Sequence, residues 1–194
     1  MNIEFKSIVI DNFMSIGHAE LSFVDNGFVV VSGINNAQDT VSNGAGKSSV
    51  FEALYWVLTG TTIRGTRDIV NRYAEGGTSV VLNFCVSGDS FCVQRTREHP
   101  VLKNSLHIYK DGKDLSGKGL RESDKKLTEL LPSLTEEFLS SVVILGQGLP
   151  NRFSSNSPTG RKEILENLTN QDLIVSEICQ KIQLYFSTLN DNAL

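Results

Sequence analysis

The stretch VVVSGINNAQDTVSNGAGKSS, residues 29–49, decides the fold of this chain, because its second half has the pattern of a phosphate-binding loop. A Walker A motif reads G-x-x-x-x-G-K-[ST] and connects a strand to a helix. The tripeptide at 46–48 matches the end of this motif, but the position of its first glycine holds Val41. The nearest earlier glycine, Gly33, lies too far upstream. The stretch is therefore either a nucleotide site with an enlarged loop or an accidental GKS.

The residues on both sides predict the strand–loop–helix order that a phosphate loop requires. The continuous apolar run at 28–31 predicts a strand buried on both faces. The turn signal at 25–27 predicts a hairpin that joins this run to the strand before it. A helix is predicted after Lys47, with Gly60 at its end. Its apolar residues at helical spacing are Val50, Phe51, Leu54, Tyr55 and Leu58. This order disfavours an accidental GKS.

The loop also suits phosphate chemistry residue by residue. Gly44 and Gly46 allow backbone conformations that point N–H groups at phosphate oxygens, and the following helix adds the positive end of its dipole. Lys47 would reach the β- and γ-phosphates of a nucleotide, and the Ser48 hydroxyl would ligate Mg²⁺. The polar insert Ile34–Val41 can bulge into solvent while both ends of the loop stay fixed. A lid or a dimer contact is a second hypothesis for this insert.

The rest of the chain combines short strands with short helices. We expect strands at Ile3–Ile10, Ala19–Phe23, Ser79–Phe84, Phe91–Arg95 and Ser105–Tyr109, the last three forming an antiparallel meander. We expect helices at Glu122–Leu131, at Glu136–Leu139 and from Pro158 to about Leu168. Apolar residues near the C-terminus fit the seam of a coiled coil and, equally well, an ordinary amphipathic helix. They are Ile178, Ile182, Tyr185 and Leu189.

Composition places the chain among cytosolic globular proteins. Its 194 residues suit one domain or slightly more, and 40% hydrophobic with 21% charged residues is typical of a chain that buries a core. The net charge of −4 gives no bulk attraction to nucleic acid, although a local basic patch is compatible with it. No signal peptide is visible, and no apolar stretch approaches the ~18 residues that span a membrane. Three cysteines without a CxxC pair suit a reducing cytosol.

Three motifs, taken together, resemble one known family, the SMC-like ABC ATPases of DNA double-strand-break repair. The similar members are the SbcC type and the large subunit of phage recombination endonucleases. The opening at Ile8–Ser15 resembles the family's first strand, which ends N-F-x-S, and Asn43–Ser49 resembles its NGxGKSS loop. Ile144–Gly148 resembles the glutamine loop, and its usual sequel, a proline and an R-K-E-x-x-E-x-L-like helix, follows at 158–168. The motifs span nearly the whole chain.

The resemblance implies roles for particular residues. Gln147 would contact Mg²⁺ and the attacking water, which suits an amide that both donates and accepts without adding charge. Lys47 and Gln147 would be the catalytic residues, and Ser48 and Gln147 the metal ligands. Arg72 is equally well explained as a solvated surface arginine. The implied nucleotide-binding residues are Asn12, Met14, Ser15, Asn43, Gly44, Ala45, Gly46, Lys47, Ser48, Ser49, Asn71, Arg72 and Tyr73.

Two groups that this kind of ATPase needs are absent from the sequence. No apolar strand ends in adjacent Asp-Glu, the source of the general base. Leu115–Gly119 imitates the signature loop but precedes the glutamine loop, contrary to the family order. We therefore expect an α/β P-loop NTPase fold of the ABC/SMC head type, with residues 1–168 as the N-terminal half of the head and 169–194 as the start of a coiled coil. Alone, this half should bind ATP weakly and hydrolyse little.

The resemblance also implies partners and a cellular role. This half would pair with the C-terminal half of the same head. With ATP and Mg²⁺, the complete head would act as an ATPase, dimerise with a second head, bind double-stranded DNA ends and regulate a metallophosphoesterase-type nuclease. The resemblance implies a cytoplasmic, nucleoid-associated location (the host cytoplasm for a phage protein) and no membrane partner. Candidate contacts to DNA phosphates, each equally explained as surface charge, are Arg64, Arg67, Arg72, Arg95, Arg97 and Lys103.

Two other classes of P-loop protein are alternatives. A stand-alone kinase or small-molecule transferase would need its own catalytic aspartate or arginine lid, and the β meander after the first helix argues against it. The nucleotide-binding domain of a transporter shares the ATPase core. The N-F-x-S opening and the coil-like C-terminus disfavour that reading.

Overall fold

The computed structural model describes residues 2–24, 27–33, 46–65, 68–132, 134–144, 157–169 and 181–182. The chain forms two compact units, Met1–Leu134 and Thr135–Leu194. The strands are β1 (Ile3–Phe13), β2 (Ile16–Ser22), β3 (Thr78–Val86), β4 (Asp89–His99), β5 (Lys103–Lys110) and β6 (Lys113–Asp114). The helices are α1 (Lys47–Thr59), α2 (Leu120–Leu130), α3 (Glu136–Phe138) and α4 (Pro158–Thr169), with a π-helical turn, η1, at Leu139–Val143.

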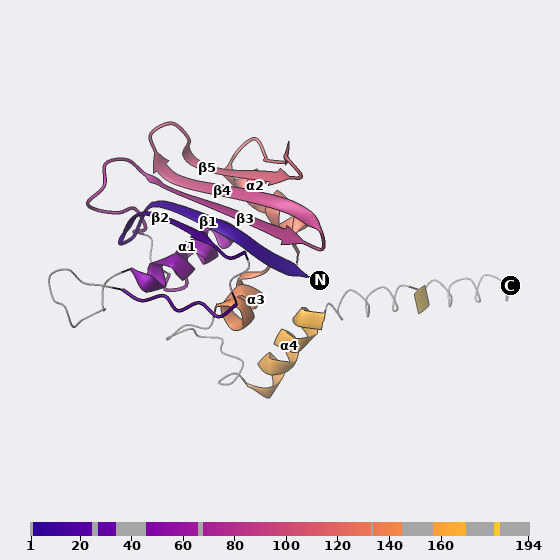
Figure 1. Ribbon diagram of the computed structural model, residues 1–194. Coiled ribbons are helices and arrows are strands. Elements are labelled where there is room, and N and C mark those ends of the chain that lie inside the picture. Colours follow the sequence, from indigo (N-terminus) through magenta and orange to yellow (C-terminus); the bar gives the residue numbers. More distant parts are fainter. Residues whose placement is uncertain are drawn as a thin grey trace. The chain divides into compact units, whose positions relative to one another are not determined.

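The first unit is built on a six-stranded antiparallel sheet with the order β2-β1-β3-β4-β5-β6. Strands β3 to β6 follow one another as neighbours, so the predicted meander is confirmed (Figure 1). The tight turn at Asp111–Gly112 reverses the chain through two left-handed residues, with φ of 48° and 77°. Strand β1 lies between β2 and β3, which places the β1–β2 turn next to the segments that follow α1.

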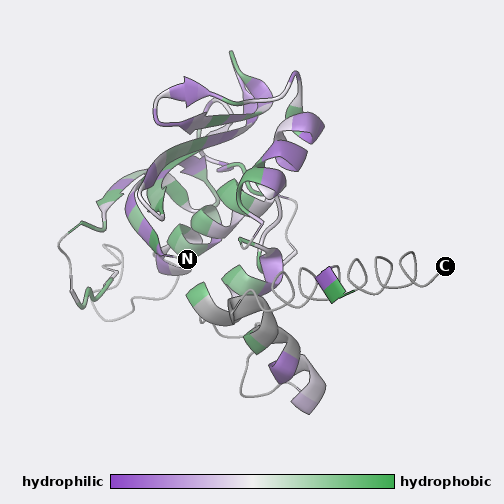
Figure 2. Cartoon of the chain, turned by 90° about the vertical axis from the view of Figure 1, so that its right-hand side faces the viewer, coloured by the Kyte–Doolittle hydropathy of each residue, from purple (hydrophilic) through white to green (hydrophobic). Residues whose placement is uncertain are grey.

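Helix α1 packs against the middle of this sheet and forms the core with it. Alternate residues of the central strands are fully buried, as the period of two in a strand requires when one face is covered. Seven consecutive residues of α1, from Glu52 to Leu58, are also buried. The rings of Phe13 and Trp56 lie 5.5 Å apart and join β1 to α1. Figure 2 shows α1 as mainly hydrophobic and α2, which packs on β5, as mainly hydrophilic.

The run Phe28–Val31 differs from its prediction. Its residues belong to no strand, and their exposed fractions are 96%, 60%, 74% and 42% in order. The predicted hairpin with β2 is also wrong, because β2 is an edge strand of the described sheet and Phe28–Val31 forms no strand beside it. A strand buried on both faces needs neighbours that hydrogen-bond to it and side chains that cover it. None of the six described strands pairs with this run, so the apolar pattern is present without the structure that it predicts.

The second unit contains the predicted short helices. Thr135 caps α3 by accepting a hydrogen bond from the backbone N–H of Phe138. Ser157 precedes α4, and its hydroxyl accepts from the N–H of Gly160, which confirms the predicted start. Of the predicted coiled-coil seam, only Ile182 lies within the described residues, where it is helical. The coiled coil and the boundary at residue 168 therefore remain predictions. No described helix is long and apolar enough to cross a membrane.

Candidate nucleotide-binding site

The predicted phosphate loop ends at the N-terminus of α1. Gly46 is the residue before the helix, and its φ of 82° is left-handed, a conformation that favours glycine. Gly46, at the cap position, has no side chain with which to cap the helix, and the first turn contains no acidic residue. The positive end of the helix dipole is therefore not offset by a carboxylate in that turn, which is the condition that favours a bound anion. Ser48 is exposed in this first turn, where a hydroxyl can reach a metal bound to phosphate.

The turn between β1 and β2 lies against the same end of α1. The hydroxyl groups of Ser15 and Ser49 share a hydrogen bond of 3.0 Å. A Cβ atom at Gly46 would stand 2.9 Å from the Ser15 Oγ, so a side chain there would collide with the turn. The N-F-x-S opening and the GKSS end of the loop, which are 34 residues apart in the chain at Ser15 and Ser49, therefore meet in the structure.

A third segment joins this cluster from the chain after α1. The backbone N–H of Met14 donates to the Ile69 carbonyl at 2.6 Å, and that of Asn71 donates to the Asn12 carbonyl at 2.9 Å. Asn12 and Met14 both have left-handed φ angles, 53° and 50°. Non-glycine residues rarely adopt this conformation, and it is often found at functional sites. The structure thus brings the predicted 71–73 group next to the 12–15 group, whose Ser15 contacts the first turn of α1.

The individual side chains of the 71–73 group behave differently. Asn71 is buried, and its Oδ1 accepts from the backbone N–H of Tyr73 at 2.9 Å, so it shapes the segment. Arg72 makes an ion pair of 2.6 Å with Asp68, and both side chains are mainly exposed. Tyr73 is fully exposed. The Asn12 Nδ2 lies 3.4 Å from the carbonyl oxygen of Gly77. A contact from these four residues to a nucleotide remains a prediction.

Several predicted site residues lie outside the described residues. They are Asn43, Gly44, Ala45 and Gln147, together with the insert Ile34–Val41. Among the described residues, no group of three or more His, Cys, Asp or Glu side chains could hold a metal ion. A Mg²⁺ ion at this site would fit the donor set that remains, which is the Ser48 hydroxyl, nucleotide phosphates and water.

Glu52 is a site-supporting residue that the sequence reading missed. Its carboxylate accepts from the backbone N–H of Ile63 at 2.8 Å and lies 3.2 Å from the Arg64 Nε. Its side chain is only 4% exposed, and burial raises the pKa of the carboxyl group. Through these contacts Glu52 fixes the loop after α1 to the helix that carries Lys47. The signal was visible as an acidic residue inside the apolar run of α1.

The basic residues proposed as DNA contacts are not equivalent. Arg95 is 3% exposed and bonded to Asp124, so it cannot reach a DNA backbone, and this candidate was wrong. Arg64 and Arg72 are paired with carboxylates but remain on the surface. Arg97 is half-buried, and Lys103 is exposed at the β4–β5 turn. Arg67 lies outside the described residues.

Comparison with known proteins identifies the family. An AAA domain model matches residues 7–192. The DNA double-strand break repair Rad50 ATPase of Methanocaldococcus jannaschii is 28% identical over 172 residues, which is 89% of this chain and 16% of that protein. The Rad50 ATPase of Sulfurisphaera tokodaii is 27% identical over 187 residues, 91% of this chain and 20% of that protein. This chain thus spans only about a fifth of the length of these relatives.

A solved structure of the recombination mediator protein RecF with ATPrS is also similar, with 19% identity and a TM-score of 0.41 over 59% of this chain and 28% of that chain. The family match confirms the predicted α/β P-loop ATPase fold. Because that match covers nearly all of the sequence and the Rad50 relatives align with most of it, the chain belongs to the AAA domain family, within the SMC-like ATPases of the Rad50 and SbcC type.

Proposed function

We propose that this chain is the ATP-binding N-terminal half of the head of a DNA repair and recombination ATPase. The observation that carries the proposal is the N-terminus of α1, where Gly46, Lys47 and Ser48 follow one another beside the β1–β2 turn. An extended anion with several phosphates suits this end of a helix, because the dipole, the backbone N–H groups and a lysine act on it together.

The proposed mechanism assigns each residue one task. Lys47 would bind the β- and γ-phosphates, and Ser48 would hold Mg²⁺, which would neutralise charge on the phosphates. Ser15 holds the β1–β2 turn against the first turn of α1 through its hydrogen bond to Ser49. Gln147 orients the attacking water, as the resemblance implies. No residue of the sequence supplies the Asp-Glu pair that would accept the proton from that water.

The missing base supports the proposal that the C-terminal half of the same head completes the site. The exposed run Phe28–Val31 supports it independently. Four consecutive apolar side chains in water cost free energy, and a strand added from a partner would bury them and pair their backbone groups. We propose that the assembled head dimerises with ATP, binds DNA ends and regulates a metallophosphoesterase-type nuclease.

Replacing Lys47 tests the phosphate site directly. Lys47→Ala should weaken ATP binding by about tenfold or more, because at least one charge-assisted hydrogen bond to phosphate is lost. Calorimetric titration of the purified chain with Mg²⁺-ATP measures the affinity. Lys125→Ala is the matched control, since Lys125 is a mainly exposed lysine on α2. Equal affinity in the Lys47 variant and the parent chain would remove the assignment of the phosphate loop.

A further inference from the structure

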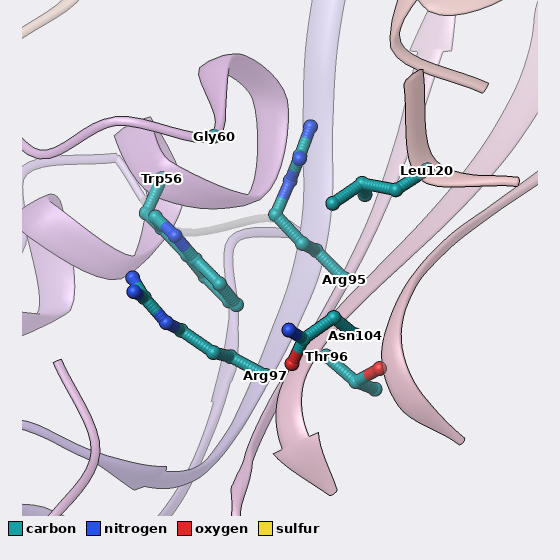
Figure 3. Close-up of a pocket in the computed structure, with 7 residues that line it drawn as sticks. All are labelled: Trp56, Gly60, Arg95, Thr96, Arg97, Asn104 and Leu120. Atoms are coloured by element: carbon teal, nitrogen blue, oxygen red, sulfur yellow. The ribbon is translucent and has the colours of Figure 1, made fainter. Parts of the chain in front are cut away.

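A recess lies at the other end of α1, away from the phosphate loop. It has a volume of about 180 Å³ and is lined by α1, β4, β5 and the first residue of α2 (Figure 3). Its walls include Trp56, Arg95, Arg97, Asn104 and Leu120. Helix α1 has 13 residues, so at 1.5 Å per residue its two ends are roughly 20 Å apart. The recess therefore lies near the C-terminal end of α1, away from Lys47 and Ser48 in its first turn.

Arg95 forms a fixed wall of this recess. Its Nε donates to the Val57 carbonyl at 3.0 Å, which satisfies a backbone group at the C-terminal end of α1. Its Nη2 lies 2.7 Å from an oxygen of Asp124, and its guanidinium is 6.0 Å from the Trp56 ring. The Asp124 carboxylate thus compensates the charge of Arg95.

Arg97 has no such compensation. It follows Arg95 by two positions on β4, so both side chains leave the same face of the strand. Arg97 is half-buried and pairs through its backbone with β3, but its side chain forms no hydrogen bond or ion pair with the residues that the structure describes. In Figure 3 the indole of Trp56 lies between the two guanidinium groups. The recess therefore contains one arginine whose charge no described carboxylate neutralises.

Asn104 adds a directed donor at the rim. Its Oδ1 accepts from the backbone N–H of Glu98 at 2.7 Å, which fixes the orientation of the amide. Figure 3 shows the amide nitrogen on the side of Trp56. Together with the planar fork of Arg97, this arrangement presents several N–H donors to one oxyanion.

We propose that this recess binds one phosphate group, of inorganic phosphate or of a small phosphate ester. Its volume is below the roughly 300 Å³ of pockets that enclose a drug-sized ligand, so it suits a compact group. Arginine binds phosphate in a bidentate manner, and the low-dielectric walls from Trp56 and Leu120 strengthen that attraction. The guanidinium group of Arg97 lines a concave recess, and a single phosphate group enters such a recess more readily than the wide backbone of a DNA duplex.

The test uses Trp56, the only tryptophan of the chain, as a reporter. The 194-residue chain with Lys47→Ala, which removes the loop's own phosphate ligand, is titrated with inorganic phosphate while tryptophan fluorescence is recorded. We expect a saturable change at constant ionic strength. Adding Arg97→Gln should weaken the apparent affinity by at least about tenfold, the loss expected for a charge-assisted hydrogen bond. Circular dichroism checks that the variants remain folded.

Arg121→Gln is the matched control, because Arg121 is an exposed arginine next to Leu120 that does not line the recess. It should leave the phosphate response unchanged. A stronger response to AMP than to phosphate would identify an ester as the ligand, and an equal response would identify the phosphate group alone. Three results would overturn the proposal. The first is an equal loss of phosphate affinity in the Arg97→Gln and Arg121→Gln variants, and the second is a fluorescence change with sodium chloride as large as that with phosphate. The third is a fluorescence change with succinate or a short DNA duplex but none with phosphate.

Discussion

At the scale of single residues, the first unit depends on two buried charged side chains that bond α1 to neighbouring segments. Arg95 bonds to the Val57 carbonyl at the C-terminal end, and Glu52 bonds to the loop after the helix. Buried charges are stable only when they are paired and hydrogen-bonded, and both residues meet this condition. Both contacts lie beyond the middle of α1, at Val57 and Ile63, yet each restricts the helix that positions Lys47.

Glu52 should make stability depend on pH. Burial raises its pKa, so the folded state binds the proton more tightly than the unfolded state. The carboxyl group then favours folding most below its unfolded pKa, and stability falls as pH rises from there through the raised folded pKa. Glu52→Gln should remove this fall, which urea unfolding between about pH 4 and pH 7 measures.

Two further variants complete this prediction. Glu52→Ala should destabilise the chain by about 1–3 kcal/mol, because it leaves the N–H of the half-buried Ile63 without its acceptor. Glu129→Gln, at a mainly exposed position on α2, should leave the pH dependence of the parent chain intact. If Glu52→Gln shows the same pH dependence as the parent, the buried carboxylate does not titrate in this window.

At the scale of elements, the structures that depend on neighbouring residues in the sequence were predicted well. Those that depend on contacts with distant segments were not. Helix α1 and its stop at Gly60 follow from neighbouring residues, as does the meander β3–β5. The run Phe28–Val31 was predicted as a strand because apolar periodicity cannot show whether neighbouring strands exist. The burial of Glu52 and Arg95 depends on distant segments, so their residue types alone predicted surface positions.

The proposed role of the Phe28–Val31 run leads to a test at this scale. Val30→Asp should leave the stability of the isolated chain within about 0.5 kcal/mol, because Val30 is already 74% exposed. The same change should weaken binding of the C-terminal half by about tenfold or more, since association would bury an unpaired carboxylate. Thermal unfolding and calorimetric titration measure the two effects.

Val101→Asp is the matched control for this test. Val101 is 79% exposed at the β4–β5 turn, on a hairpin that the proposal does not involve. It should alter neither stability nor association. Unchanged association of the Val30 variant, or equal weakening by both variants, would show that the apolar run does not receive a strand from the C-terminal half.

At the scale of the whole molecule, the predicted site was only partly observable. The contacts among Ser15, Ser49 and the 69–71 segment join residues that are distant in the chain, and the family resemblance, not local pattern, led to them. Gln147 and the front of the phosphate loop lie outside the described residues. The described part therefore supports the proposed ATP-binding half-site, while the missing Asp-Glu pair is proposed to come from the other half of the head.

The central claim is that this chain binds ATP but needs the C-terminal half to hydrolyse it. The most direct measurement is steady-state ATP turnover with Mg²⁺ and a linear duplex, for the chain alone and after addition of the C-terminal half, with Lys47→Ala as the inactive control. We expect negligible ATP turnover by the chain alone and a clear rise in turnover when the C-terminal half is added. Lys47→Ala should abolish this rise. Turnover by the chain alone that the C-terminal half does not change would contradict it.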